Sequence, residues 1–133
     1  MAVIVNPQPV IAAIKAAVEG AGFAFGDSRK PAVVGTKPWV VAWFDAGIVE
    51  DRTMRSRDGW SMVGTFHSVG LTPEAARIAA RAVRNAVLGL HLAVIDGRTV
   101  QMPENLSSLP MQRDDDVDPP IFDQVDEWRI RTT

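Results

Sequence analysis

An acidic run near the C-terminus has the clearest chemical potential in this sequence. Arg113 precedes four aspartates within five positions, and Pro119 and Pro120 close the run. The four aspartates are Asp114, Asp115, Asp116 and Asp118. Carboxylate oxygens are the ligands that magnesium and calcium prefer. The spacing is not that of an EF-hand, because no glycine follows at the turn and no distal glutamate fits. The run therefore favours a solvated or interface loop over a metal site.

The rest of the sequence also contains no pattern that predicts catalysis. His67 and His91 are the only histidines, and no acid or nucleophile is spaced along the chain to work with either, so both are interpreted as structural or surface residues. The serines lie in no nucleophile-elbow motif, and no glycine-rich loop has a phosphate-binding spacing. The absence of cysteine excludes disulfides and thiolate metal sites. We therefore expect no catalytic residue, no metal and no cofactor.

Length and composition predict one globular domain over residues 1–133. Apolar residues make up 47% of the chain and charged residues 23%, which is ordinary for a soluble domain. A net charge of −2 argues against general binding to nucleic acid or to an acidic membrane. No apolar run approaches the roughly 20 residues of a membrane span, and no basic region precedes the apolar start as in a signal peptide. We expect a protein that stays in a cytoplasm or in an assembly formed there.

A helix over residues 72–90 is the element around which the chain is organised. Thr72 can cap its N-terminus, Pro73 suits the first helical position, and Glu74 lies where the helix dipole favours an acid. Its apolar half is mostly alanine, so a flat partner can approach closely, and we expect that partner to be a β-sheet. The other half is expected to lie away from the sheet and carries Arg77, Arg81 and Arg84.

A shorter helix ending near Gly20 and several strands complete the predicted order. Strands are indicated by alternating or β-branched apolar runs, and loops by glycine and proline. The predicted strands are residues 39–44, 60–69, 92–95, 98–102 and 121–131, and the predicted loops are residues 26–38, 45–59, 103–110 and 113–120. This order predicts an α+β two-layer sandwich, in which a mostly antiparallel sheet of about four strands carries two helices on one face.

The strand at residues 39–44 is apolar on both faces. Helices cover one face only, so the other face still exposes either Trp39 and Trp43 or Val40 and Phe44. A monomer rarely leaves such a patch in water, so we expect self-association. The alternative is a loop that folds over the patch.

The connection at residues 45–59 is long for a hairpin loop, and such loops tend to be functional. Its charges nearly balance, with Glu50, Asp51 and Asp58 against Arg52, Arg55 and Arg57. It is either a solvated arm or an arm that reaches a neighbouring subunit, where mixed charges set register. In the second case its arginines would meet the acidic run of that subunit. The predicted interface residues are Trp39, Trp43, Arg52, Arg55, Arg57, Asp58, Arg113, Asp114, Asp115, Asp116 and Asp118.

The stretch at residues 113–122, with Val125, Asp126 and the ending at residues 128–133, resembles a known family. It is similar to the tail terminator proteins of bacteriophages with long, non-contractile tails. The resemblance extends to residues 1–7, to the apolar strand before the charged loop, and to the Thr-Pro-Glu-Ala-Ala start of the long helix.

This resemblance implies an α+β domain that forms a six-membered ring on the head-proximal end of the tail tube. The ring would stop tube polymerisation and offer a surface to neck proteins, while genomic DNA passes through its hole. The implied partners are other copies of the chain, the tail tube protein and a neck or head-completion protein, in a virion assembled in the host cytoplasm.

Three alternatives stay open. The first is another neck, head–tail connector or minor tail protein. The second is a metal-dependent hydrolase that uses the carboxylates of residues 114–118. The third is a bacterial interaction module of the same fold.

Overall fold

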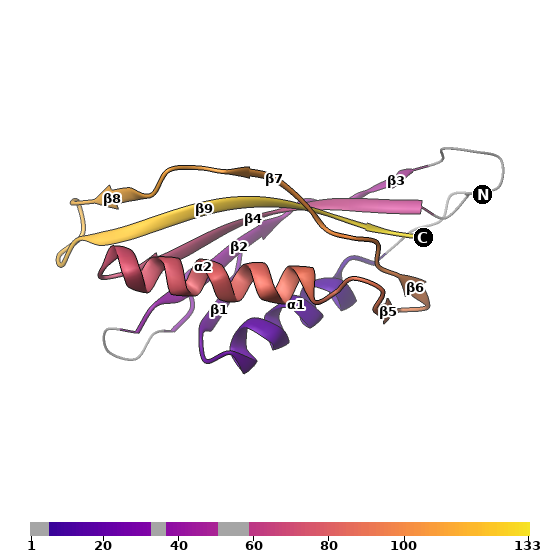
Figure 1. Cartoon of the computed structure of the whole chain (residues 1–133), viewed down its shortest axis with the longest axis horizontal. Coiled ribbons are helices and arrows are strands. Elements are labelled where there is room, and N and C mark those ends of the chain that lie inside the picture. Colours follow the sequence, from indigo (N-terminus) through magenta and orange to yellow (C-terminus); the bar gives the residue numbers. More distant parts are fainter. Residues whose placement is uncertain (1–5, 33–36, 51–58) are drawn as a thin grey trace.

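The computed structural model describes residues 6–32, 37–50 and 59–133, and it contains one main sheet with two helices (Figure 1). The helices are α1 (Gln8–Gly20) and α2 (Pro73–Leu88). The strands of the main sheet are β1 (Ala24–Asp27), β2 (Trp39–Phe44), β3 (Ile48–Glu50), β4 (Gly59–Gly70), β7 (Glu104–Ser108), β8 (Gln112–Asp114) and β9 (Ile121–Thr132). The short strands β5 (Val94–Ile95) and β6 (Arg98–Thr99) pair antiparallel and lie within the predicted strands at residues 92–95 and 98–102.

The sheet is ordered β1-β2-β4-β9-β7, with β3 paired to β4 and β8 paired to β9. Only the β1–β2 pair is parallel among these pairings. Both helices lie on the same side of the sheet in Figure 1. The predicted α+β two-layer sandwich is therefore confirmed, and β1, β3, β7 and β8 are short strands that extend the predicted sheet.

All four predicted loops are wrong in part, because each contains strand residues. β3 lies within the predicted loop at residues 45–59, and β8 extends to Asp114 of the one at residues 113–120. β1 includes Gly26 and Asp27 of the predicted loop at residues 26–38, and β7 lies within the one at residues 103–110. The sequence of β7 has no alternation of apolar residues, and β1 is only four residues long. Both strands lie at the edges of the sheet, so their conformation comes from pairing with β2 and β9 rather than from local propensity.

Small residues let α2 approach the sheet closely, as its alanine-rich face predicts. The Thr72 hydroxyl accepts a hydrogen bond from the backbone N–H of Ala75 at 3.1 Å and caps the helix. Ala76 and Ala79, on the side of α2 that faces the sheet, are fully buried. At Gly70, the last residue of β4, an added Cβ would lie 2.7 Å from the backbone nitrogen of Ala76. The start of α2 is therefore packed directly on backbone, without an intervening side chain.

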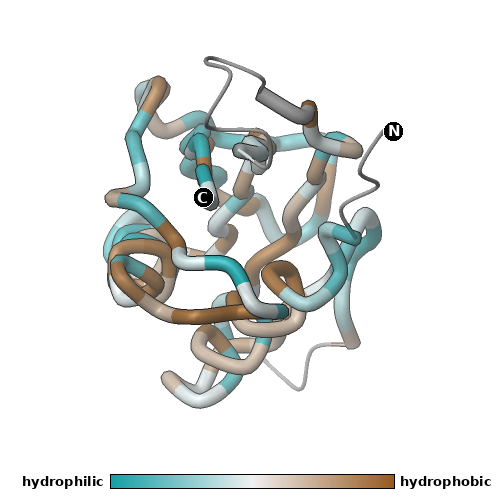
Figure 2. The backbone as a smooth tube through the Cα atoms, turned by 90° about the vertical axis from the view of Figure 1, so that its right-hand side faces the viewer, coloured by the Kyte–Doolittle hydropathy of each residue, from teal (hydrophilic) through white to brown (hydrophobic). Residues whose placement is uncertain are grey.

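One apolar cluster fills the space between the layers. α1 contributes an apolar stripe of Val10, Ile11, Ile14 and Val18, all of which are buried. Alternate residues of the long strands point toward the helices, and Figure 2 shows this alternation as changes between brown and teal along the tube. The helix-facing residues of β2, β4 and β9 in this cluster are Val40, Ala42, Trp60, Met62, Phe66, Trp128 and Ile130.

Ala79 provides a test of this close packing. We expect Ala79→Leu to lower the free energy of unfolding by about 1–3 kcal/mol, because the added atoms must enter a filled space. The control is Ala16→Leu on the exposed side of α1, which should change it by less than about 0.5 kcal/mol. Urea unfolding followed by circular dichroism measures both. Equal effects of the two variants would contradict the close contact.

Candidate interaction surfaces

The face of the sheet that points away from the helices is named the outer face. It carries alternate residues of the three central strands: Trp39, Val41 and Trp43 of β2; Ser61, Val63, Thr65, His67 and Val69 of β4; Asp123, Val125, Glu127, Arg129 and Arg131 of β9. Trp39 and Trp43 therefore point to the outer face, whereas Val40 and Phe44 of the same strand point toward the helices. Trp43 is 45% exposed, so the outer face keeps a large apolar side chain in contact with solvent.

The chain covers part of this face itself. Residues that follow β1 turn back over the outer side of Gly26, where an added Cβ would clash with the backbone of Arg29 and the ring of Pro31. The ammonium group of Lys30 lies 5.2 Å from the ring centre of Trp39, a cation–π distance. A covering loop therefore accounts for the half-burial of Trp39 but leaves Trp43 exposed. The role of both tryptophans as interface residues stays a prediction.

A polar pair lies beside Trp43. Nδ1 of His67 and Oδ2 of Asp123 are 2.8 Å apart, and both side chains are partly buried. The His67 ring also meets the Trp43 ring edge to face, with centroids 5.1 Å apart. The sequence spacing gave no acid partner for His67, yet the fold supplies Asp123. The partner is 56 residues away in the sequence and is placed there only by the pairing of β4 with β9.

The other end of the outer face is charged. Glu104 of β7 lies 3.8 Å from the guanidinium nitrogens of both Arg129 and Arg131. Such partly exposed pairs contribute little to stability, since water screens them. They do divide the outer face into an aromatic half around Trp43 and a charged half near the end of β9.

The acidic run forms the connection between β8 and β9 at one tip of the molecule, on the left of Figure 1. Within it, the side-chain Nε of Arg113 donates to Asp115, and Asp114 accepts from the backbone N–H of Asp116 at 2.9 Å. Arg113 also lies over the ring of Phe122. Among the described residues, no group of three or more acidic or histidine side chains is placed to hold a metal ion.

The second predicted charged loop cannot be placed. Arg52, Arg55, Arg57 and Asp58 lie outside the described residues, so their suggested contact with the acidic run stays a prediction.

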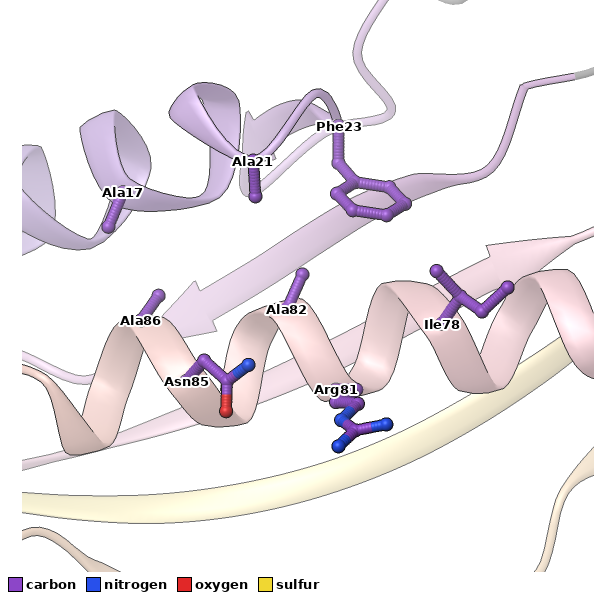
Figure 3. Close-up of a pocket in the computed structure, with 8 residues that line it drawn as sticks. All are labelled: Ala17, Ala21, Phe23, Ile78, Arg81, Ala82, Asn85 and Ala86. Atoms are coloured by element: carbon purple, nitrogen blue, oxygen red, sulfur yellow. The ribbon is translucent and has the colours of Figure 1, made fainter.

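Two grooves flank α2. The first, about 380 Å³, lies between α1 and α2, where Ala17, Ala21 and Phe23 point toward Ile78, Ala82 and Ala86 (Figure 3). The second, about 220 Å³, lies between α2 and strands β7 and β9 and is named the arginine groove. Its lining includes Arg77, Ala80, Arg81, Arg84, Asn105, Ser108, Gln124, Asp126 and Trp128. The three arginines are exposed, yet they border the edge of the sheet instead of lying away from it as expected.

No helix in the described ranges has both the length and the hydropathy needed to cross a membrane.

A double-mutant cycle tests the polar pair on the outer face. His67→Ala, Asp123→Ala and the double variant should give a coupling energy of about 0.5–1.5 kcal/mol, the usual range for a partly buried hydrogen bond. The free energies come from urea unfolding at neutral pH. A coupling energy near zero would mean that the pair does not stabilise the folded chain.

Among the comparisons with known proteins, only the solved structures give matches, and they concern the fold. No protein-family model matches the chain, and no curated protein matches it either. A chain from the virion of a native gene transfer agent particle is 20% identical, with a TM-score of 0.61, and the match covers 92% of this chain and 96% of that one. A second solved structure, whose name states no role, is 11% identical with a TM-score of 0.59 and covers 96% of both chains. The chain therefore has a fold that recurs, nearly end to end, in a virion protein.

Proposed function

We propose that this chain is a structural virion protein of the tail terminator type. It forms a six-membered ring on the head-proximal end of a tail tube, stops tube polymerisation and provides the surface for joining the head. Its partners are further copies of itself, the tail tube protein and a neck or head-completion protein. Genomic DNA passes through the ring without sequence-specific recognition. The protein is not an enzyme in this proposal.

The observation that carries the proposal is the likeness to a chain of a gene transfer agent virion. That match covers 92% of this chain and 96% of that chain, so the likeness extends over nearly the whole fold described. The sequence similarity to tail terminators, densest at residues 113–122, points in the same direction and supports a position at the end of the tail.

The surfaces of the chain also support an assembly role. The outer face carries the exposed Trp43, the acidic run is at a tip, and the arginine groove is on the helix layer. These surfaces differ in chemistry and lie on different parts of the molecule. Contacts between unlike surfaces are head-to-tail and close into rings when the rotation allows it.

The neck position is the second candidate, because a virion likeness supports it as well. A head–tail connector would also be built from such surfaces, but it would have no effect on tube length. Tail length therefore separates the two functions.

Deleting the gene from the virus or particle system that encodes it tests the proposal. We expect tails of uncontrolled length that do not join heads, because nothing blocks the growing end. Adding purified protein afterwards should not shorten these tails, since a cap blocks ends without cutting. Electron microscopy measures the lengths. Tails of normal length that remain separate from heads would refute the terminator role and favour the neck position.

Trp43 tests the contribution of the outer face to self-association. Trp43→Ser should weaken assembly about tenfold or more, because large aromatic side chains dominate interface energies. It should lower the thermal unfolding midpoint only modestly, since the side chain is already 45% exposed, although its edge-to-face contact with His67 is lost. Val94→Ser, at a 70% exposed position on the β5–β6 hairpin, is the control and should assemble normally. Light scattering measures the mass. Unchanged assembly of the Trp43 variant would exclude the outer face from the interface.

A further inference from the structure

The arginine groove exists because α2 does not cover the whole sheet. The helix packs on β2, β4 and β9 and leaves the adjoining edge strand β7 beside it. Arg77, Arg81 and Arg84 follow each other at intervals of four and three residues, which places them on one side of α2. At 1.5 Å per residue they span about 10 Å along the helix. The groove is thus bordered by a row of cations and floored by the polar side chains of β7 and β9.

The charge of this row is not neutralised within the described part of the chain. None of the three guanidinium groups forms an ion pair or hydrogen bond with a described residue. One carboxylate lies in the groove, that of Asp126, which is 9% exposed and accepts a hydrogen bond from Gln124 Nε2 at 3.3 Å. Three arginines against one aspartate leave an excess of positive charge, so the groove is suited to an acidic occupant.

The acidic run has the opposite imbalance. Its four aspartates share one arginine, Arg113, and the carboxylates of Asp116 and Asp118 have no partner among the described residues. Like charges at this spacing repel one another unless cations meet them. The run lies at the tip of the molecule, where it can reach another copy without a change in the fold (Figure 1).

We propose that the acidic run of one copy, Asp114–Asp118 in sequence, docks in the arginine groove of the next copy. The inference deepens the proposed ring, and it replaces Arg52, Arg55 and Arg57 with the arginines of α2 as the main partners. Each copy presents both halves of the contact on different surfaces, so the contact is heterologous and can propagate around a ring. Because both halves are exposed, salt should weaken it.

Disulfide trapping tests the contact directly, since the chain contains no cysteine. The variant with both Arg84→Cys and Asp116→Cys should give a ladder of covalent oligomers on oxidation, ending at the size of the ring, since Arg84 lines the arginine groove and not the other one. Ile78→Cys with Asp116→Cys is the control, because Ile78 points into the other groove (Figure 3). That control should give no ladder. Oligomers by light scattering without a ladder from the first variant would overturn the docking and leave the ring intact.

Charge reversal provides the second measurement. Replacing Arg77, Arg81 and Arg84 with Glu should weaken association about tenfold or more, and so should replacing Asp114, Asp115 and Asp116 with Lys. Combining all six changes should restore association, because the complementarity returns with the signs exchanged. Reversing Arg52, Arg55 and Arg57 is the matched control and should have a smaller effect. A larger effect of that control would assign the acidic run to the loop and overturn the proposal.

Two further outcomes are decisive. If the arginine variant assembles normally but loses binding to double-stranded DNA, the row contacts phosphates and the proposal is wrong. If the unaltered protein stays monomeric at high concentration and on intact tails, the ring itself fails. Circular dichroism on every variant establishes that the fold is retained.

Discussion

The register between β4 and β9 is the constraint on which the rest of the structure depends. The two strands share eleven residue pairs at the centre of the sheet. Because side chains alternate between faces, a slip of one residue would exchange the core for the outer face. In the observed register Phe66 is buried beneath the helices, and its neighbour His67 reaches Asp123 on the opposite side. Core and outer surface are therefore consequences of the same hydrogen-bond ladder.

Small residues set the second constraint, the distance between the layers. Gly70, Ala76 and Ala79 bring α2 close against the strands, and the helix contacts β2, β4 and β9 in the middle of the sheet. At Gly64 an added Cβ would lie 2.8 Å from the ring of Phe44, so the absence of a side chain makes room for the aromatic pair Phe44 and Phe66. The edge strand β7 pairs with β9 on its far side and therefore lies beside the helix rather than beneath it. The arginine groove is the space that results.

The surfaces that remain differ in character. The outer face combines an aromatic half with a charged half, the tip is acidic, and the helix layer carries cations. None of the described acidic and histidine side chains converges on a metal-binding geometry. The chemistry of the described residues is therefore distributed over several separate surfaces instead of being gathered in one site.

The sequence alone determined the elements whose signals are local. The cap at Thr72, the alanine-rich face of α2 and the alternation along β4 and β9 each depend on neighbouring residues, and each is confirmed. Tertiary structure decided what depends on distant partners. β7 has no alternating apolar pattern and is a strand only because β9 pairs with it. Likewise, His67 meets an acid 56 residues away, and the arginines of α2 border a groove, because strand order and layer spacing bring them there.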